Sequence, residues 1–269
     1  MKLAFLYAGQ GAQHVGMGRD LYEIYPAFRQ VLDSAPVDFD LKKLCFDGPE
    51  DQLNDTRYTQ PCMVAFAAGV TALLREAGIT PDYAAGLSLG EYSALQCAGV
   101  FDAKTAISLV AFRGQAMADA VQGRPCGMAA VLGMDRDALK AVCAEASDAG
   151  VVECTNFNCP GQIVIGGDAL AVEEAGCLAL EAGARRVIPL KVSGPFHTSL
   201  MAPAGRALEE RLKGVEFGPM EVPTLFNCLG GPMREGDTIP GLLVRQVQNS
   251  VHMEDSIRFL EAQGVDTVV

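Results

Sequence analysis

Ser88 has the sequence context of a catalytic nucleophile. It stands between two glycines in the segment Gly86-Leu-Ser-Leu-Gly90, after a short apolar strand and before a predicted helix. The flanking glycines allow a turn so sharp that the serine side chain projects from its tip, as in a nucleophile elbow. The N–H of Leu89 then lies at the start of the helix, where it suits an oxyanion. A plain turn between a strand and a helix has the same pattern, so this segment alone leaves both interpretations open.

A serine nucleophile needs a general base, because its hydroxyl is barely ionised at neutral pH. The sequence has three histidines, His14, His197 and His252. His197 follows a predicted strand in the segment SGPFHTSLM, a Gly-Pro loop before a helix. Loops at strand ends often carry catalytic side chains. We therefore favour His197 as the base, while a structural role is the commoner one for a lone histidine.

Arg113 is a charged residue on an apolar helix face. In the predicted helix DAKTAISLVAFRGQAM, apolar residues recur at helical spacing, and Arg113 falls on the same stripe. Burial of a guanidinium is costly unless a carboxylate pairs with it. An internal Asp or Glu would be a structural partner, and an anionic substrate held by two hydrogen bonds would be a functional one. The serine 25 residues earlier favours the substrate.

A glycine-rich segment, AGQGAQHVGMG, follows the first predicted strand at residues 8–18. A dinucleotide-binding fingerprint would need glycine at position 14, where histidine stands, and the sequence has no Gly-Lys-Ser/Thr of a phosphate-binding loop. The segment is either a tight turn or a source of exposed backbone N–H groups near a reacting centre.

The composition excludes several classes of protein. Asp and Glu number 33 against 21 Lys and Arg, and the net charge of −12 disfavours nucleic-acid and membrane-surface binding. Apolar runs are shorter than the roughly 18 residues of a membrane helix, and the apolar N-terminal stretch is too short for a secretory signal. The nine cysteines are scattered and form no C-x-x-C, which disfavours disulfides and zinc. We expect a cytoplasmic monomer without metal or cofactor.

Alternating strands and helices predict an α/β fold with a mostly parallel sheet. The order between 125 and 191 is βαββαβ, which is typical of a ferredoxin-like unit. We therefore expect an α/β-hydrolase-like catalytic subdomain at 1–124 and 192–269 and an inserted ferredoxin-like small subdomain at 125–191. The predicted strands are 3–8, 83–87, 127–132, 151–157, 162–166, 185–190 and 222–227, and the predicted helices are 17–32, 62–77, 90–98, 101–121, 135–147, 168–182, 202–213 and 240–263.

Taken together, six segments give the chain a family resemblance that spans Leu3 to Val268. They are AGQGAQHVGMG, TQP at 59–61, GLSLGEYSAL, AFRGQAM, NFNCPGQIVIGG and SGPFHTSLM. They occur in the order found in malonyl-CoA:acyl carrier protein transacylases, whose fold also serves as the acyltransferase domain of polyketide and fatty acid synthases. Members of the family usually continue past AQGVDTVV into a Gly-Pro-Gly segment and a last helix.

The resemblance implies a catalytic role for five residues. Ser88 is the nucleophile that becomes malonylated, and His197 is its general base and then acid. Gln10 and Leu89 supply the backbone N–H groups of the oxyanion hole. Gln246, in LVRQVQNSV, resembles the residue whose backbone carbonyl orients the histidine, so the pair works as a dyad without a triad acid.

The resemblance also implies the substrates. Arg113 pairs with the free carboxylate of the malonyl group, and Phe196 resembles the bulky residue that selects malonyl over methylmalonyl. Malonyl-CoA would acylate Ser88, and the phosphopantetheine thiol of acyl carrier protein would accept the malonyl group in fatty acid biosynthesis. Because one thioester replaces another, the reaction needs no ATP.

Other functions remain open at this point. A stand-alone acyltransferase that serves a polyketide synthase would have the same motifs. A serine thioesterase or esterase would share Ser88 and His197 but normally has an acidic triad member and no use for Arg113. A non-catalytic docking module for acyl carrier protein would not need these three residues.

Overall fold

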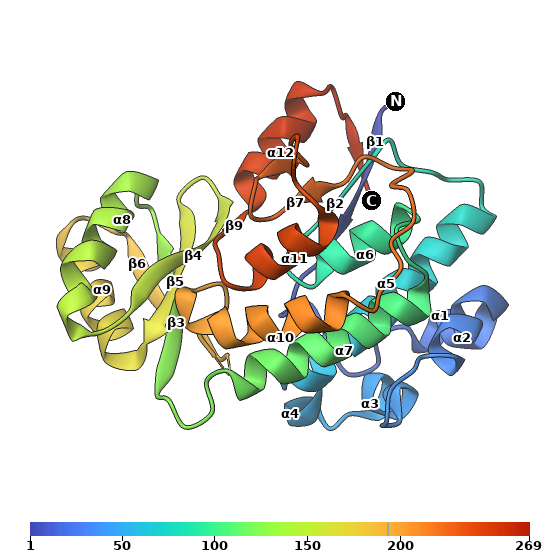
Figure 1. The fold of residues 1–269 in the computed structure, drawn as a ribbon, viewed down its shortest axis with the longest axis horizontal. Helices are drawn as coiled ribbons and strands as arrows, with labels where there is room; N and C mark the ends of the chain where they lie inside the picture. Colours follow the sequence, from blue (N-terminus) through green and yellow to red (C-terminus); the bar gives the residue numbers. More distant parts are fainter. Residues whose placement is uncertain (193) are drawn as a thin grey trace. The chain divides into compact units, whose positions relative to one another are not determined.

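The computed structural model describes residues 1–192 and 194–269, and its contacts divide the chain into two units. Unit 1 comprises Met1–Gln115, Gly214–Phe226 and Phe259–Val269, and unit 2 comprises Ala116–Lys213 and Asn227–Arg258. Figure 1 traces the chain from blue to red through both. These units are defined by contacts, and the catalytic and small subdomain boundaries expected from the sequence remain a prediction.

Unit 1 contains a parallel sheet in the order β10-β1-β2. Strand β1 (Leu3–Tyr7) pairs in parallel with β2 (Tyr83–Gly86) and with β10 (Thr267–Val268). The Leu87 N–H donates to the Tyr7 carbonyl at 2.9 Å just beyond the last pair of the ladder. Because parallel strands end at the same edge of a sheet, the glycine-rich turn after β1 and the Ser88 turn after β2 lie side by side.

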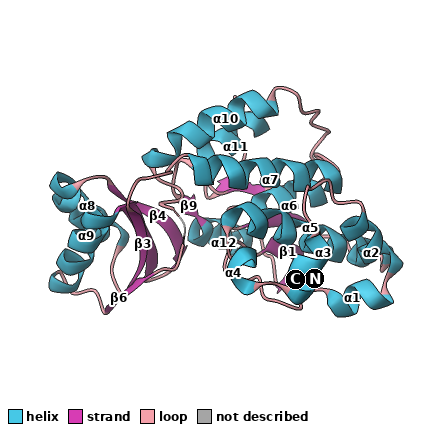
Figure 2. Ribbon diagram, turned by 90° about the horizontal axis from the view of Figure 1, so that it is seen from below, coloured by secondary structure: helices cyan, strands magenta, loops and turns pink. Residues whose placement is uncertain are grey.

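The helices of unit 1 surround these strands (Figure 2). They are α1 (Arg19–Ile24), α2 (Pro26–Asp33), α3 (Leu41–Asp47), α4 (Glu50–Leu53), α5 (Thr56–Glu76), α6 (Gly90–Cys97) and α7 (Ala103–Asp119), the last of which continues into unit 2. The predicted single helix at 17–32 is wrong, because Pro26 starts a new helix and forces Tyr25 into an extended conformation. Within the described residues, no helix is long and apolar enough to cross a membrane.

Unit 2 contains an antiparallel sheet with the strand order β6-β3-β5-β4. In chain order its elements are β3 (Cys126–Leu132), α8 (Arg136–Glu145), β4 (Val152–Cys159), β5 (Gln162–Asp168), α9 (Ala169–Glu181) and β6 (Arg186–Pro189). This βαββαβ arrangement, with its first and third strands in the centre, is ferredoxin-like. The predicted fold class, a mixed α/β protein with a parallel sheet and a ferredoxin-like part, is confirmed.

The last part of the chain departs from the predicted helix at 240–263. The structure has α11 (Ile239–Val247), the short strand β9 (Val251–His252) and α12 (Met253–Ala262). Strand β9 interrupts the helix because it pairs in parallel with the edge strand β4, a contact distant in sequence. The remaining elements are α10 (Ala202–Leu212), β7 (Leu225–Phe226), β8 (Gly231–Pro232) and two short 3₁₀ helices, Ala146–Ala149 and Ser199–Met201.

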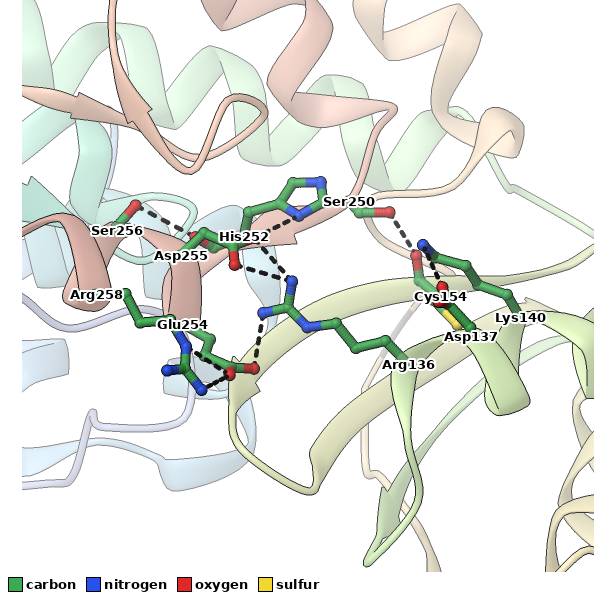
Figure 3. A network of polar contacts seen from close by, with 10 residues as sticks. All are labelled: Arg136, Asp137, Lys140, Cys154, Ser250, His252, Glu254, Asp255, Ser256 and Arg258. Atoms are coloured by element: carbon green, nitrogen blue, oxygen red, sulfur yellow. Dashed lines mark hydrogen bonds and ion pairs between the residues drawn. The ribbon is translucent and has the colours of Figure 1, made fainter.

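A charged network in unit 2 holds α8 against the start of α12, as Figure 3 shows. The guanidinium of Arg136 pairs with Glu254 at 2.7 Å and with Asp255 at 2.9 Å. The same group lies over the Phe157 ring, 4.8 Å from its centroid, and His252 stacks on that ring at 5.1 Å. The junction of β9 with α12 is therefore held by both charge and packing.

Candidate active site

The loop that carries Ser88 is a strained elbow that only glycine neighbours allow. Ser88 has a φ of 55°, in the left-handed region that non-glycine residues rarely adopt. A Cβ on Gly86 would lie 2.1 Å from the backbone of Gly90, and one on Gly90 would lie 2.5 Å from the Tyr7 carbonyl oxygen. The elbow interpretation of this segment is therefore the one that the local geometry matches.

The glycine-rich turn after β1 lies against this elbow. A Cβ on Gly9 would lie 2.8 Å from the Leu87 carbonyl oxygen, so glycine is what lets the two loops approach. Gln10 follows in this turn, and Leu89 is the residue immediately before α6. Their backbone N–H groups are thus on two adjacent loops at the carboxyl edge of the sheet. That position suits the oxyanion role predicted for them.

Arg113 is buried beside the nucleophile. Its side chain is 1% exposed, and Nη2 donates to Ser88 Oγ at 2.9 Å. Nη1 donates to the side-chain oxygen of Gln60 at 2.7 Å. The guanidinium also lies 5.7 Å from the centroid of the Tyr92 ring. The structure therefore joins the predicted nucleophile and the predicted carboxylate-binding residue within unit 1.

Burial acts on both charged and polar groups at this site. It lowers the pKa of Arg113, while the nearby Tyr92 and Glu91 act in the opposite direction. Burial likewise raises the pKa of Tyr92 to about 12, so its hydroxyl stays protonated at neutral pH. A cation with little access to water interacts strongly with an anionic group brought to the serine.

Sequence reasoning missed two polar residues of this site, Thr56 and Gln60. Gln60 lies within the TQP segment, but no role was predicted for it. Both side chains are buried, four residues apart on the same face of α5. The available signal was a pair of polar residues at helical spacing next to the apolar run that begins at Cys62.

His197 lies in unit 2, and its ring is held by a main-chain carbonyl. It has a φ of 63° and is 3% exposed. Its Nδ1 lies 2.8 Å from the main-chain oxygen of Gln246, at the end of α11. A carbonyl oxygen only accepts, so the proton of the neutral ring is on Nδ1 and the lone pair is on Nε2. This is the tautomer that a general base requires.

The other residues predicted around the base have different surroundings. Phe196 is buried in a cluster with Val121, Met128 and Met201, and a Cβ on Gly194 would lie 3.0 Å from its ring. Ser193, the first residue of the SGPFHTSLM segment, lies outside the described residues.

The two other histidines, His14 and His252, lie in surroundings that contain none of the predicted site residues. His14 is exposed at the wall of an apolar cavity of about 240 Å³, and burial lowers the pKa of the His252 ring in the network on Phe157.

The predicted site residues thus form two groups. Unit 1 brings together Ser88, Arg113, the Gln10 turn and Leu89, and unit 2 brings together His197 and Gln246 with Phe196 next to the histidine in sequence. Their catalytic and binding roles remain predictions.

These features define a class: α/β proteins with a serine on a strand-to-helix elbow, here with an adjacent buried arginine. Comparison with protein families is more specific. The model of the acyl transferase domain matches residues 4–269, and the chain belongs to that family.

Individual relatives are similar over the whole chain. The malonyl CoA-acyl carrier protein transacylase of Bacillus subtilis is 44% identical, over 100% of this chain and 86% of the relative. The crystal structure of the acyl-carrier-protein S-malonyltransferase of Burkholderia pseudomallei is 42% identical with a TM-score of 0.95, covering 100% of this chain and 88% of that one. A malonyl-transacylase in complex with a type II polyketide synthase acyl-carrier protein is 39% identical with a TM-score of 0.96, with coverage of 100% and 88%.

Proposed function

We propose that this chain transfers a malonyl group from malonyl-CoA to the phosphopantetheine thiol of acyl carrier protein, through a malonyl ester on Ser88. The observation that carries the proposal is the buried guanidinium of Arg113, whose Nη2 lies 2.9 Å from Ser88 Oγ. A guanidinium is suited to grip a carboxylate with two hydrogen bonds. An acyl group bound to this serine would therefore be favoured if it carried a carboxylate at its far end. The names of the relatives support the same reaction.

In the proposed first half-reaction, Ser88 Oγ attacks the thioester carbon of malonyl-CoA. His197 Nε2 takes the serine proton, and the backbone N–H groups of Gln10 and Leu89 stabilise the oxyanion. The C–S bond then breaks, and the proton passes to the departing CoA thiolate. In the second half-reaction the carrier thiol attacks the ester and gives its proton to His197. Ser88 leaves as the alcohol, and no cofactor takes part.

The main experiment is mass spectrometry of the intact protein after incubation with malonyl-CoA. We expect a single malonyl adduct on Ser88, lost on addition of acyl carrier protein, and no adduct on Ser88→Ala. Loss of a member of such a catalytic unit reduces the rate by about 10⁴-fold or more. Substantial transfer by Ser88→Ala would overturn the proposal, and steady release of free malonate at a rate rivalling transfer would indicate a thioesterase instead.

The pathway needs a separate experiment. We propose fatty acid biosynthesis as the setting, in the cytoplasm, where the nine cysteines would remain reduced; the structure forms no disulfide among the described residues. The relative in complex with a polyketide carrier protein keeps a polyketide role as the alternative. Comparison of kcat/KM for fatty acid and polyketide carrier proteins distinguishes them.

A further inference from the structure

A continuous chain of hydrogen-bonded side chains, half-buried at Gln10 and buried in its other members, links the glycine-rich turn to the arginine. The Thr56 hydroxyl donates to the side-chain oxygen of Gln10 at 2.9 Å, and the Gln60 amide nitrogen donates to the Thr56 hydroxyl at 2.9 Å. The Gln60 oxygen accepts from Arg113 Nη1 at 2.7 Å, and Arg113 Nη2 donates to Ser88 at 2.9 Å. We call Gln10, Thr56, Gln60 and Arg113 the relay. Every member lies in unit 1.

The guanidinium of Arg113 only donates, so it sets the direction of the relay by requiring the amide oxygen of Gln60. The hydroxyl of Thr56 continues the relay in that direction. It has one hydrogen, which it donates to Gln10, and its oxygen lone pair accepts from Gln60. This places the amide nitrogen of Gln60 toward Thr56 and the amide oxygen toward Arg113. The opposite amide orientation would set an NH₂ group against the guanidinium, donor against donor. Thr56 holds Gln60 in the orientation that the cation requires, because its hydroxyl accepts from the Gln60 amide nitrogen.

The relay is anchored where two helices meet. Thr56 is the first residue of α5 and is 0% exposed, and Gln60 is 1% exposed. On α7, a Cβ added to Gly114, the neighbour of Arg113, would lie 2.6 Å from the Thr56 carbonyl oxygen. The backbones of α5 and α7 thus approach closely at the same point where Gln60 of α5 bonds to Arg113 of α7. Because Thr56 and Gln60 are buried, water does not replace a hydrogen bond that is lost when the Thr56 hydroxyl is removed.

We infer that Thr56 is a positioning residue for acyl selectivity, which acts through Gln60 on the guanidinium of Arg113 and through Gln10 on the oxyanion turn. The inference rests on the proposed function. A cation held in one orientation loses less entropy when it binds the malonyl carboxylate. An acetyl group has no carboxylate, so its transfer depends on the relay only through Gln10. Loss of the Thr56 hydroxyl should therefore affect malonyl transfer more than acetyl transfer.

The test compares Thr56→Val with a matched control, Thr59→Val. Thr59 lies on the same helix and is equally buried at 0% exposure, but its hydroxyl donates to the backbone oxygens of Leu53 and Asp55. Acylation by malonyl-CoA and by acetyl-CoA is measured for each variant, together with its thermal unfolding. For Thr56→Val we expect a rise in KM for malonyl-CoA and a fall in the malonyl-to-acetyl ratio of kcat/KM by about fivefold, the scale of one hydrogen bond between neutral groups.

The controls separate positioning from stability. Thr59→Val should lower the unfolding temperature by a similar amount but leave the malonyl-to-acetyl ratio unchanged, and Thr56→Ser, which keeps the hydroxyl, should restore the ratio. An unchanged ratio in Thr56→Val, or an equal change in Thr59→Val, would overturn the inference. If Thr56→Val does not fold, Gln60→Met must lower the ratio in the same way. Failure of the unaltered chain to become malonylated would instead overturn the proposed function.

Discussion

We expect replacement of Arg113 to separate binding of the malonyl carboxylate from the rest of the chemistry. In Arg113→Lys the charge stays, but an ammonium cannot make the two-pronged contact of a guanidinium. We expect malonyl transfer to fall by roughly 10²-fold, the scale for truncation of one partner of a buried charge pair. Acetyl transfer should fall much less, and single-turnover acylation with both thioesters measures the difference.

Equal losses for the two acyl groups would contradict this assignment. They would indicate that Arg113 serves only to hold the fold around Ser88 and Gln60. The unfolding free energy of Arg113→Lys, measured in urea, shows whether the variant is intact enough for the comparison.

The sequence was sufficient to predict site residues that conflict with the pattern of their own segment. Ser88 between glycines and Arg113 on an apolar stripe both conflict with their surroundings, and the structure places them within hydrogen-bond distance. Thr56 and Gln60 break no such pattern. Their local signal is only a pair of polar residues at helical spacing. Their partners lie on α7 and on the glycine-rich turn, and contacts so distant in sequence cannot be predicted from that pair.

Among the elements, α5 and α7 depend on the absence of a side chain at Gly114. Alanine is the better helix former by about 1 kcal/mol, so Gly114→Ala would stabilise an isolated helix. Here its Cβ would meet the Thr56 oxygen at 2.6 Å and the Arg57 Cα at 3.1 Å, backbone atoms that cannot rotate away. We expect a net loss of about 1–3 kcal/mol in unfolding free energy. We also expect a higher KM for malonyl-CoA, because α7 carries Arg113.

Gly176→Ala on α9 is the matched control. Its Cβ would meet only the tip of the Val187 side chain, at 3.3 Å. A small change in stability and an unchanged KM are expected from urea unfolding and steady-state kinetics. A Gly114→Ala protein as stable as the unaltered chain would show that the two helices can separate at no cost.

The network between α8 and α12 should make stability depend on pH. Burial is the largest single influence and alone would raise the pKa values of Glu254 and Asp255. The hydrogen bonds and charge of Arg136, together with Arg258 at Glu254 and His252 at Asp255, outweigh it, and both pKa values are lowered. Carboxylates with a lowered pKa stabilise the fold above their unfolded value, near pH 4, and lose that contribution as the pH falls through the folded value. Arg136→Met should therefore cost on the order of 1 kcal/mol at pH 7 and less below about pH 4.

Unfolding in urea at a series of pH values checks this expectation. Lys140→Met is the control, since Lys140 also lies over Phe157, at 5.6 Å, and pairs with the exposed Asp137 at 3.5 Å. It should change stability little at any pH. A loss in Arg136→Met that stays constant with pH would mean that packing on Phe157, not charge, holds α8 to α12.

Elements were predicted well where periodicity alone decides them. The βαββαβ order of unit 2 follows from local patterns and turns, and its strands are those expected to within a few residues. The helix predicted at 240–263 failed because β9 exists only through its pairing with β4. For the same reason β10, two residues long beside β1, was not expected.

For the molecule as a whole, the charge of −12 works against an acidic partner. Acyl carrier proteins are generally acidic, so docking requires a local basic surface. Strand β6 is an edge strand. Arg185, just before it, and Arg186, its first residue, are exposed near Ile188, which is 42% exposed. We expect Arg185→Glu/Arg186→Glu to raise KM for acyl carrier protein, with a larger effect at lower salt. Malonylation of Ser88 by malonyl-CoA should hardly change.

Lys104→Glu/Arg206→Glu is the control, because it alters the net charge by the same amount at exposed positions on α7 and α10. If it raises KM equally, the total charge matters and not the β6 surface. If the β6 variant slows both half-reactions alike, its arginines act on CoA or on the fold, and the docking prediction is wrong.

The hydrogen bond between His197 Nδ1 and the main-chain oxygen of Gln246 has an evolutionary consequence. Where a carboxylate orients a catalytic histidine, one codon change deletes the acceptor. A peptide carbonyl is present whichever amino acid occupies position 246, so no substitution there removes it, provided that the new side chain fits the buried space. The orientation of His197 therefore depends on the path of the backbone at the end of α11, and selection that preserves the orientation must preserve that path. A substitution at 246 that fits the buried space leaves the acceptor of the ring, and with it the tautomer, in place.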